Sequence, residues 1–153
     1  MKKIVIIPDS FKGTISSQEA GRIIEEEAKK RWLDVETVRM EIADGGEGSV
    51  DAFLSVLDGE KKQVKVRGPY GEQVESFYGK IKEAAVIEMA AAAGLPLAGE
   101  HLNAGEATTY GVGELILDAL QGGVKKIILG LGGSATNEGG AGALAALGVK
   151  FFE

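Results

Sequence analysis

The sequence has no cysteine and a single histidine, His101. Without cysteine, neither a disulfide framework nor a thiolate metal site can form. With one histidine, a site built on several histidines cannot be assembled within one chain, and acyl transfer of the Ser–His type is disfavoured. His101 lies in a polar loop, 97–107, and we interpret it as a bystander. The chemistry left open is that of carboxylates, lysine, hydroxyl groups and backbone amides.

Long apolar runs and basic clusters are also missing. No apolar run approaches the roughly 18 to 20 residues of a membrane helix, and the run Ile4 to Ile7 follows the start directly, without a signal-peptide pattern. Lysine and arginine total 17 against 23 aspartates and glutamates, which gives a net charge of −6. We therefore expect a cytoplasmic protein that binds neither nucleic acid nor membranes. The oligomeric state stays open.

Glycine is abundant, with 23 residues, and it is most concentrated between Gly130 and Gly142. This stretch follows the apolar run 127–129 and precedes a segment of small residues, 141–147, so it predicts a strand, a glycine turn and a helix. Glycine lets a ligand approach the backbone closely, and helix-start amides favour anions. The stretch matches neither the dinucleotide-binding nor the Walker A spacing. It therefore forms either a cradle for phosphate or carboxylate, or a turn that serves packing alone.

The first 58 residues predict two further strand–turn–helix units. Residues 3–8 indicate a fully buried parallel strand, and a capping box at Ser16 predicts a helix from 17 to about 32. Residues 35–42 indicate a half-buried strand, with Glu36, Val38, Met40 and Ile42 as the more apolar set, and a helix follows at 49–57. The turns between these elements cover 9–14 and 44–49.

Both of these turns carry candidate functional residues. Asp9, Ser10 and Lys12 occupy the first, as ligand-binding groups or as ordinary turn and surface residues. Asp44 and Glu47 flank the glycines of the second, where a carboxylate pair suits a divalent cation or a substrate hydroxyl. The alternative for that pair is an acidic helix start, which helices favour in any case.

The middle of the chain has a different pattern. Residues 60–81, with Gly68-Pro69-Tyr70-Gly71 at the centre, predict an antiparallel hairpin. A buried strand at 84–89 carries Glu88 among apolar neighbours, so Glu88 is either functional or ion-paired. The remaining expected elements are a short helix at 91–96, a helix from 108 that Gly122-Gly123 ends, a strand at 126–130, a helix at 141–147 and a strand beginning at 149–152.

These elements predict an α/β fold with a parallel sheet and a second, partly antiparallel lobe. We expect boundaries that give 1–58 as the start of the first lobe, 59–107 as the second, and 108–153 as a return to α/β segments. The strand beginning at the C-terminus suggests an incomplete fold. If the strands before the three glycine turns are parallel, the turns lie along one sheet edge. Acids, a lysine and free amides together suit phosphoryl transfer better than hydride transfer.

Five motifs resemble the bacterial glycerate kinase type-1 family, in order and over nearly the whole chain. They are Ile-Pro-Asp-Ser-Phe-Lys-Gly at 7–13, Ala-Asp-Gly-Gly-Glu-Gly-Ser-Val-Asp-Ala at 43–52, Val-Ile-Glu-Met-Ala-Ala-Ala-Ala-Gly-Leu at 86–95, Thr-Thr-Tyr-Gly-Val-Gly-Glu-Leu-Ile at 108–116 and Gly-Leu-Gly-Gly-Ser-Ala-Thr-Asn-Glu-Gly-Gly at 130–140. The match covers only the N-terminal portion of that family, and Glu138 stands where the family often has aspartate. The resemblance implies two α/β lobes, one flavodoxin-like, with the active site in the cleft between them.

The resemblance also implies an activity: ATP-dependent phosphorylation of D-glycerate, usually to 2-phosphoglycerate, with a divalent cation such as Mg²⁺. It places Asp9, Ser10 and Lys12 near substrate or phosphate, with Asp44 as the first candidate for the catalytic base and Asp9 as the second. Asp44 and Glu47 would serve the metal or the glycerate hydroxyls. An anion, either the glycerate carboxylate or an ATP phosphate, would be held by Gly132, Gly133, Ser134, Thr136 and Asn137. The alternatives are a non-catalytic module that binds a sugar acid or nucleotide, and a catalytically incomplete fragment.

Overall fold

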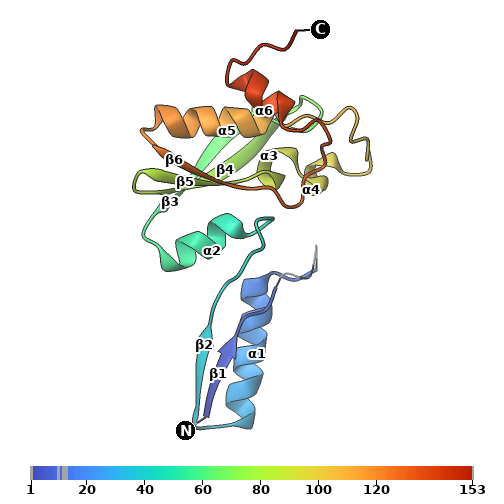
Figure 1. The fold of residues 1–153 in the computed structure, drawn as a ribbon. Helices are drawn as coiled ribbons and strands as arrows, with labels where there is room; N and C mark the ends of the chain where they lie inside the picture. The colour runs from blue at the N-terminus through green and yellow to red at the C-terminus, as the bar shows by residue number, and fades with distance from the viewer. Residues whose placement is uncertain (1, 10, 12–13, 153) are drawn as a thin grey trace. The chain divides into compact units, whose positions relative to one another are not determined.

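The computed structural model describes residues 2–9, 11 and 14–152 (Figure 1). The chain forms two compact units, Met1–Ala43 and Asp44–Glu153. Strands and helices occur in both, and the two sheets are one parallel pair and one partly antiparallel sheet of four strands. The α/β class expected from the sequence is therefore confirmed. The expected division into 1–58, 59–107 and 108–153 concerns the lobes of a longer protein and stays a prediction.

The described residues of the first unit form a parallel strand pair and one helix. Strand β1 (Lys2–Ile6) pairs with β2 (Val35–Arg39), and helix α1 (Ser17–Arg31) connects them. The Ser16 hydroxyl accepts a hydrogen bond from the Glu19 amide at 3.1 Å, which confirms the predicted helix start. Helix and strand are further joined by Glu25 of α1, which accepts from Thr37 at 2.6 Å.

The strands of this unit are more exposed than the sequence predicted. Ile6 is buried, but Val5 is 51% exposed, so β1 is not fully buried, and Ile7, which follows the strand, is 49% exposed. The second strand ends at Arg39, so Met40 and Ile42, expected on its buried side, lie beyond it and are 52% and 53% exposed. The physical reason is the small number of elements in this unit, because a single helix can cover only one face of the two-stranded sheet.

The second unit is built on a sheet with the strand order β3-β4-β5-β6. Strand β4 (Gln73–Ile81) pairs antiparallel with both β3 (Glu60–Arg67) and β5 (Ala84–Glu88), and β6 (Lys126–Gly130) runs parallel to β5. The predicted hairpin is thus confirmed, and its turn is closed by a hydrogen bond from the Gly68 amide to the Glu72 carbonyl at 2.6 Å.

Helices lie on both faces of this sheet (Figure 1). Helix α5 (Tyr110–Gln121) packs on one face through Val112 and Leu115, which join Tyr78 and Ile87 in the buried core. Helix α2 (Ser49–Val56) covers the other face, where Val50 and Leu54 lie against Gly79. The helix expected at 91–96 is divided at Gly94 into α3 (Ala90–Ala93) and α4 (Leu95–Ala98). Helix α6 (Ala141–Ala146) contacts α5.

The strand expected at 149–152 does not form. Residues 149–152 are described as irregular chain, and Phe151 and Phe152 are 59% and 88% exposed. A strand needs a neighbour to pair its backbone groups, and none of the described strands pairs with this segment. Among the described residues, no helix has both the length and the apolar character needed to cross a membrane.

Candidate functional site

Two of the glycine turns, 44–48 and 130–136, meet within the second unit. The Gly132 amide donates a hydrogen bond to the Gly45 carbonyl at 2.9 Å. A Cβ atom on Gly132 would lie 2.7 Å from the Gly46 Cα, closer than real side chains allow. Glycine at 132 is therefore required by the close approach of two backbones. The turns meet through this contact and not, as the sequence suggested, along the edge of one parallel sheet, because their preceding strands belong to two sheets.

The 44–48 turn carries two exposed carboxylates on an ordered backbone. The Asp44 Oδ1 atom accepts a hydrogen bond from the Gly46 amide at 3.2 Å. Gly46 is buried, while the side chains of Asp44 and Glu47 are exposed. Gly48 has a φ of 88°, a left-handed conformation that glycine adopts without strain, and α2 starts immediately after it. The turn thus exposes the side chains of Asp44 and Glu47, while the Gly46–Asp44 hydrogen bond and the start of α2 hold its backbone.

Glu88 fixes this turn from the end of β5. The Glu88 Oε1 atom accepts a hydrogen bond from the Val50 amide at 2.6 Å, and Glu88 is only 2% exposed. Burial raises the pKa of Glu88, although hydrogen bonds from the amides of Val50 and Gly48 partly offset that rise. The sequence left Glu88 as either functional or ion-paired. It makes no ion pair with any residue that the structure describes, and it caps the start of α2 instead.

The glycine turn after β6 is anchored on both sides by backbone hydrogen bonds. The Gly130 carbonyl accepts from the Met89 amide at 2.9 Å, and the Gly133 carbonyl accepts from the Leu95 amide at 3.0 Å. The Ala135 amide donates to the Ala93 carbonyl at 2.8 Å. These bonds hold the turn against the end of β5 and the α3–α4 junction.

Several polar groups of the same turn remain able to bind a ligand. Within the described part of the chain, the amides of Gly133 and Ser134 donate to no protein acceptor. The hydroxyls of Ser134 and Thr136 lie 2.7 Å apart, and the Ser134 hydroxyl accepts from the Thr136 amide at 3.1 Å. Asn137 is exposed. Two amides and the one hydroxyl hydrogen that the Ser134–Thr136 hydrogen bond leaves free can donate to an anion from this anchored turn.

Glu138 joins the starts of two helices, a role that the sequence analysis missed. Its Oε1 atom accepts from the Thr109 amide at 2.7 Å, from the Thr109 hydroxyl at 2.6 Å and from the Gly142 amide at 3.1 Å. Burial raises the pKa of Glu138, but the hydrogen bonds from Thr109 and Gly142 outweigh burial and leave it below its ordinary value. The available signal was an acid just before a small-residue helix, which favours helix-start capping.

The first turn, 9–14, belongs to the other unit. Ser10 and Lys12 lie outside the described residues, so their expected roles stay predictions. Asp9 is described, and the Phe11 amide donates to the Ile15 carbonyl at 3.0 Å. The meeting of this turn with the other two also stays a prediction.

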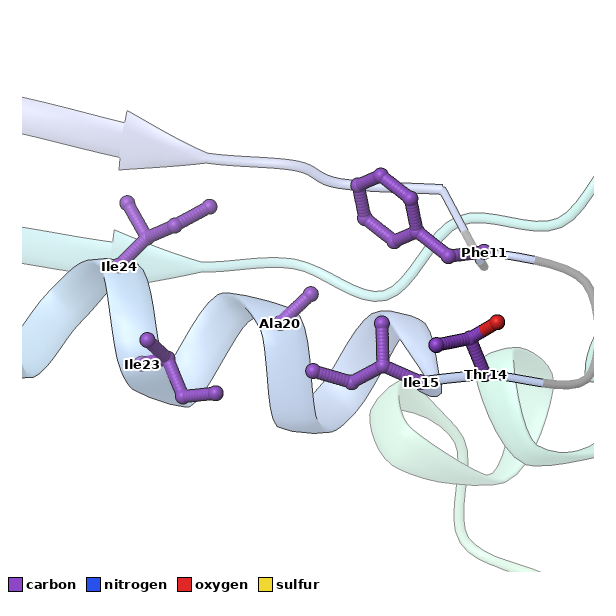
Figure 2. Close-up of a pocket in the computed structure, with 6 residues that line it drawn as sticks. All are labelled: Phe11, Thr14, Ile15, Ala20, Ile23 and Ile24. Carbon is purple, nitrogen blue, oxygen red and sulfur yellow. The ribbon is translucent and has the colours of Figure 1, made fainter.

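A pocket of about 370 Å³ follows this turn, and Figure 2 shows the side chains that line it. They come from the turn and from one side of α1, and all but one are fully apolar. The described lining consists of Phe11, Thr14, Ile15, Ala20, Ile23 and Ile24. With no charged group among these residues, the pocket does not suit an anionic substrate.

Asp44 and Glu47 were the predicted metal ligands. Among the described residues, no group of three or more His, Cys, Asp or Glu side chains could hold a metal ion. Two exposed carboxylates on one turn nevertheless fit Mg²⁺, which usually keeps several waters and takes one or two carboxylates together with substrate phosphates. The metal assignment therefore stays a prediction that the donor set permits.

The fold and the paired turns define a class: a mixed α/β protein whose glycine-rich backbone turns and exposed carboxylates lie together at one end of a partly parallel sheet. Comparison with known proteins gives the family. The model of the glycerate kinase family matches residues 4–153. The chain therefore belongs to the glycerate kinase family.

Individual relatives agree with this assignment. The chain is 47% identical to a glycerate kinase of Halalkalibacterium halodurans over 100% of the chain and 41% of the relative. It is 45% identical to the glycerate 2-kinase of Escherichia coli K12 over 97% of the chain and 40% of the relative. A crystal structure from Salmonella typhimurium LT2, described as a glycerate kinase 2, matches with a TM-score of 0.77 and 44% identity over 97% of the chain and 41% of the other. The chain thus spans about two fifths of the length of these relatives.

Proposed function

We propose that the protein to which this chain belongs phosphorylates D-glycerate with ATP and forms 2-phosphoglycerate. The observation that carries the proposal is the pair of turns at 44–48 and 130–136, held together by the Gly132–Gly45 hydrogen bond in a chain of the glycerate kinase family. One turn offers carboxylates and the other offers amide and hydroxyl donors. Phosphoryl transfer needs both kinds of group, because a hydroxyl must be oriented while anions are held.

In the proposed reaction, a glycerate hydroxyl oxygen attacks the γ-phosphorus of ATP. A new P–O bond forms, the bond to the bridging oxygen of ADP breaks, and the hydroxyl proton passes to the carboxylate of Asp44. Asp44 is our first choice for this base because its backbone is fixed and its side chain is exposed on the turn. Asp9 is the second choice, and Ser10 and Lys12 would assist in holding substrate or phosphate.

The second turn would bind an anionic group of one substrate. Its donors would be the amides of Gly133 and Ser134 and whichever hydroxyl of the Ser134–Thr136 pair does not donate to the other. Gly132 would allow close approach to the backbone, and Asn137 would add an amide group. Asp44 and Glu47 would hold Mg²⁺, which when bound offsets phosphate charge. Glu47 has the alternative of accepting a hydrogen bond from a glycerate hydroxyl. We expect a cytoplasmic enzyme, since its substrates are soluble metabolites.

Turnover by the full-length protein tests this proposal. ADP release is measured with D-glycerate, ATP and Mg²⁺, with L-glycerate and lactate as controls, and ³¹P NMR identifies the phosphorylated oxygen. We expect ADP formation that depends on D-glycerate and a product carrying phosphate on O2. Phosphate on O3 would show that the product is 3-phosphoglycerate, and the proposed glycerate kinase activity would still stand. Calorimetric binding of glycerate or ATP without turnover would favour the non-catalytic binding module instead.

A further inference from the structure

Glu88 stands out because it is a buried acid that the proposed chemistry does not use. It ends β5, it is 2% exposed, and its carboxylate is directed at the start of α2. The partner of its Oε1 atom, the Val50 amide, is 38 residues away in the sequence. A buried carboxylate is costly unless its hydrogen bonds are satisfied, so this placement needs an explanation.

The explanation lies in the start of α2, which has no capping side chain of its own. Gly48 occupies the N-cap position and provides no side-chain acceptor. Glu88 supplies the missing acceptor from a neighbouring strand, through its bond to Val50. Because the left-handed Gly48 directly precedes the helix, the position of the first helical turn determines where the chain 44–47 must run.

The same turn is held from its other side by the second glycine turn. The Gly45 carbonyl accepts from Gly132, while Gly130, two residues earlier, accepts from Met89, the residue that follows Glu88. The end of β5 therefore anchors both turns, one through a side chain and the other through its backbone. Loss of the Glu88 carboxylate would leave the start of α2 without a side-chain acceptor, held by the packing of Val50 and Leu54 against Gly79.

We propose that Glu88 is a positioning residue, which acts through the start of α2 to hold Asp44 and Glu47 at a fixed distance from the Gly132–Thr136 donors. This inference rests on the proposed function, because the groups held in place are those assigned to phosphoryl transfer. Glu88 itself touches neither substrate. Its contribution is the hydrogen-bond acceptor, and the negative charge is not required for it.

The test compares three variants of the full-length protein. Glu88→Ala removes the acceptor, Glu88→Gln keeps an acceptor oxygen without the charge, and Tyr78→Phe is the control. Tyr78 is equally buried and loses a bond to Asp118 at 3.0 Å, but that bond joins β4 to α5 and not to either turn. The readouts are kcat, KM for D-glycerate and ATP, and hydrogen exchange at the segments that contain Val50 and Gly132.

We expect Glu88→Ala to lower kcat about tenfold or more with a smaller change in KM, because misplaced groups weaken the transition state more than ground-state binding. Exchange at Val50 should become faster. Glu88→Gln and Tyr78→Phe should keep kcat within about threefold. A folded Glu88→Ala protein with unchanged kcat and unchanged exchange would overturn the inference.

Two further outcomes also support or overturn the positioning role of Glu88. If Glu88→Ala does not fold, Glu88→Gln is decisive: normal kcat and protected exchange support the acceptor role, and a loss of kcat above tenfold in this folded variant overturns it. If the wild-type protein has no turnover, the proposed function fails, while the exchange measurements still show whether Glu88 holds the turn.

Discussion

The Glu138 carboxylate receives both the backbone amide and the hydroxyl of Thr109, at 2.7 and 2.6 Å. These two residues lie 29 positions apart, one before α6 and the other at the start of α5. The contact joins the two helix starts and ties the end of the glycine turn to the core. The Glu138–Thr109 contact, which we call the joint, therefore stabilises the segment that follows the proposed anion site.

Replacing Glu138 should weaken this joint. Glu138→Ala leaves the Thr109 amide, the Thr109 hydroxyl and the Gly142 amide without their acceptor, and we expect the unfolding free energy to fall by about 1–3 kcal/mol. Glu138→Gln keeps one acceptor oxygen and should cost less. Urea unfolding of the full-length variants measures both, and equal stability of Glu138→Ala and wild type would show that the joint is unimportant.

The lowered pKa of Glu138 predicts a direction with pH. A carboxyl group with a pKa lower in the folded than in the unfolded protein contributes stability above its unfolded pKa, about 4.3, and loses it as the pH falls further. The stability difference between wild type and Glu138→Gln should therefore shrink on acidification below that value. A difference that stays constant from neutral pH into the acid range would contradict this assignment.

For Glu88 we expect the opposite dependence of stability on pH, because burial raises its pKa. A raised pKa gives a contribution to stability that is complete below the unfolded pKa and is lost as the pH rises through the folded one. The nearby charges act in both directions, since Asp51 raises the pKa of Glu88 and Lys61 lowers it. Glu88→Gln should thus gain stability relative to wild type as the pH rises. Denaturant titrations at several pH values measure this, and a flat difference would mean that the Glu88 pKa is not raised.

Gly132 should tolerate no side chain. In Gly132→Ala the new Cβ would lie 2.7 Å from the Gly46 Cα and 2.8 Å from its amide nitrogen, so the two turns must move apart. We expect a loss of about 1–3 kcal/mol in stability together with reduced turnover. Gly105→Ala is the matched control, because its nearest neighbour would be Asn103 Oδ1 at 3.4 Å. Equal behaviour of the two variants would show that the close approach of the turns is not needed.

Asp44→Asn tests the base. If Asp44 accepts the hydroxyl proton in the transition state, kcat should fall far more than glycerate affinity, by about a hundredfold or more. Asp58 is an exposed acid that follows α2, and Asp58→Asn should leave both kcat and glycerate affinity unchanged. Equal losses in kcat and affinity at Asp44 would indicate a binding role and would move Asp9 to first choice.

Local patterns in the sequence predicted many of the elements well. The N-cap at Ser16, the hairpin around Pro69 and the strands at 84–89 and 126–130 all depend on neighbouring residues, and all of them form. Strand β5 is buried as expected, whereas no residue of β6 is fully buried. The exposure of Val5 and Ile7 was not predictable from their run, because burial depends on how many helices cover the sheet.

The site was harder to predict, because its contacts join distant parts of the chain. Asp44, Glu47, Ser134 and Thr136 were found from glycine turns after strands, but no local pattern pairs Gly45 with Gly132. The capping role of Glu88 was missed for the same reason. A sequence shows that a buried acid needs a partner, but only the fold shows that the partner is a helix start.

A structure of the full-length protein with D-glycerate and a non-hydrolysable ATP analogue bound tests the paired-turn site most directly. We expect a carboxylate or phosphate oxygen about 3 Å from the Gly133 or Ser134 amide, and the reactive glycerate hydroxyl beside Asp44. Both ligands bound elsewhere, with the 130–136 turn contacting protein alone, would contradict the site and leave the turn as a packing element.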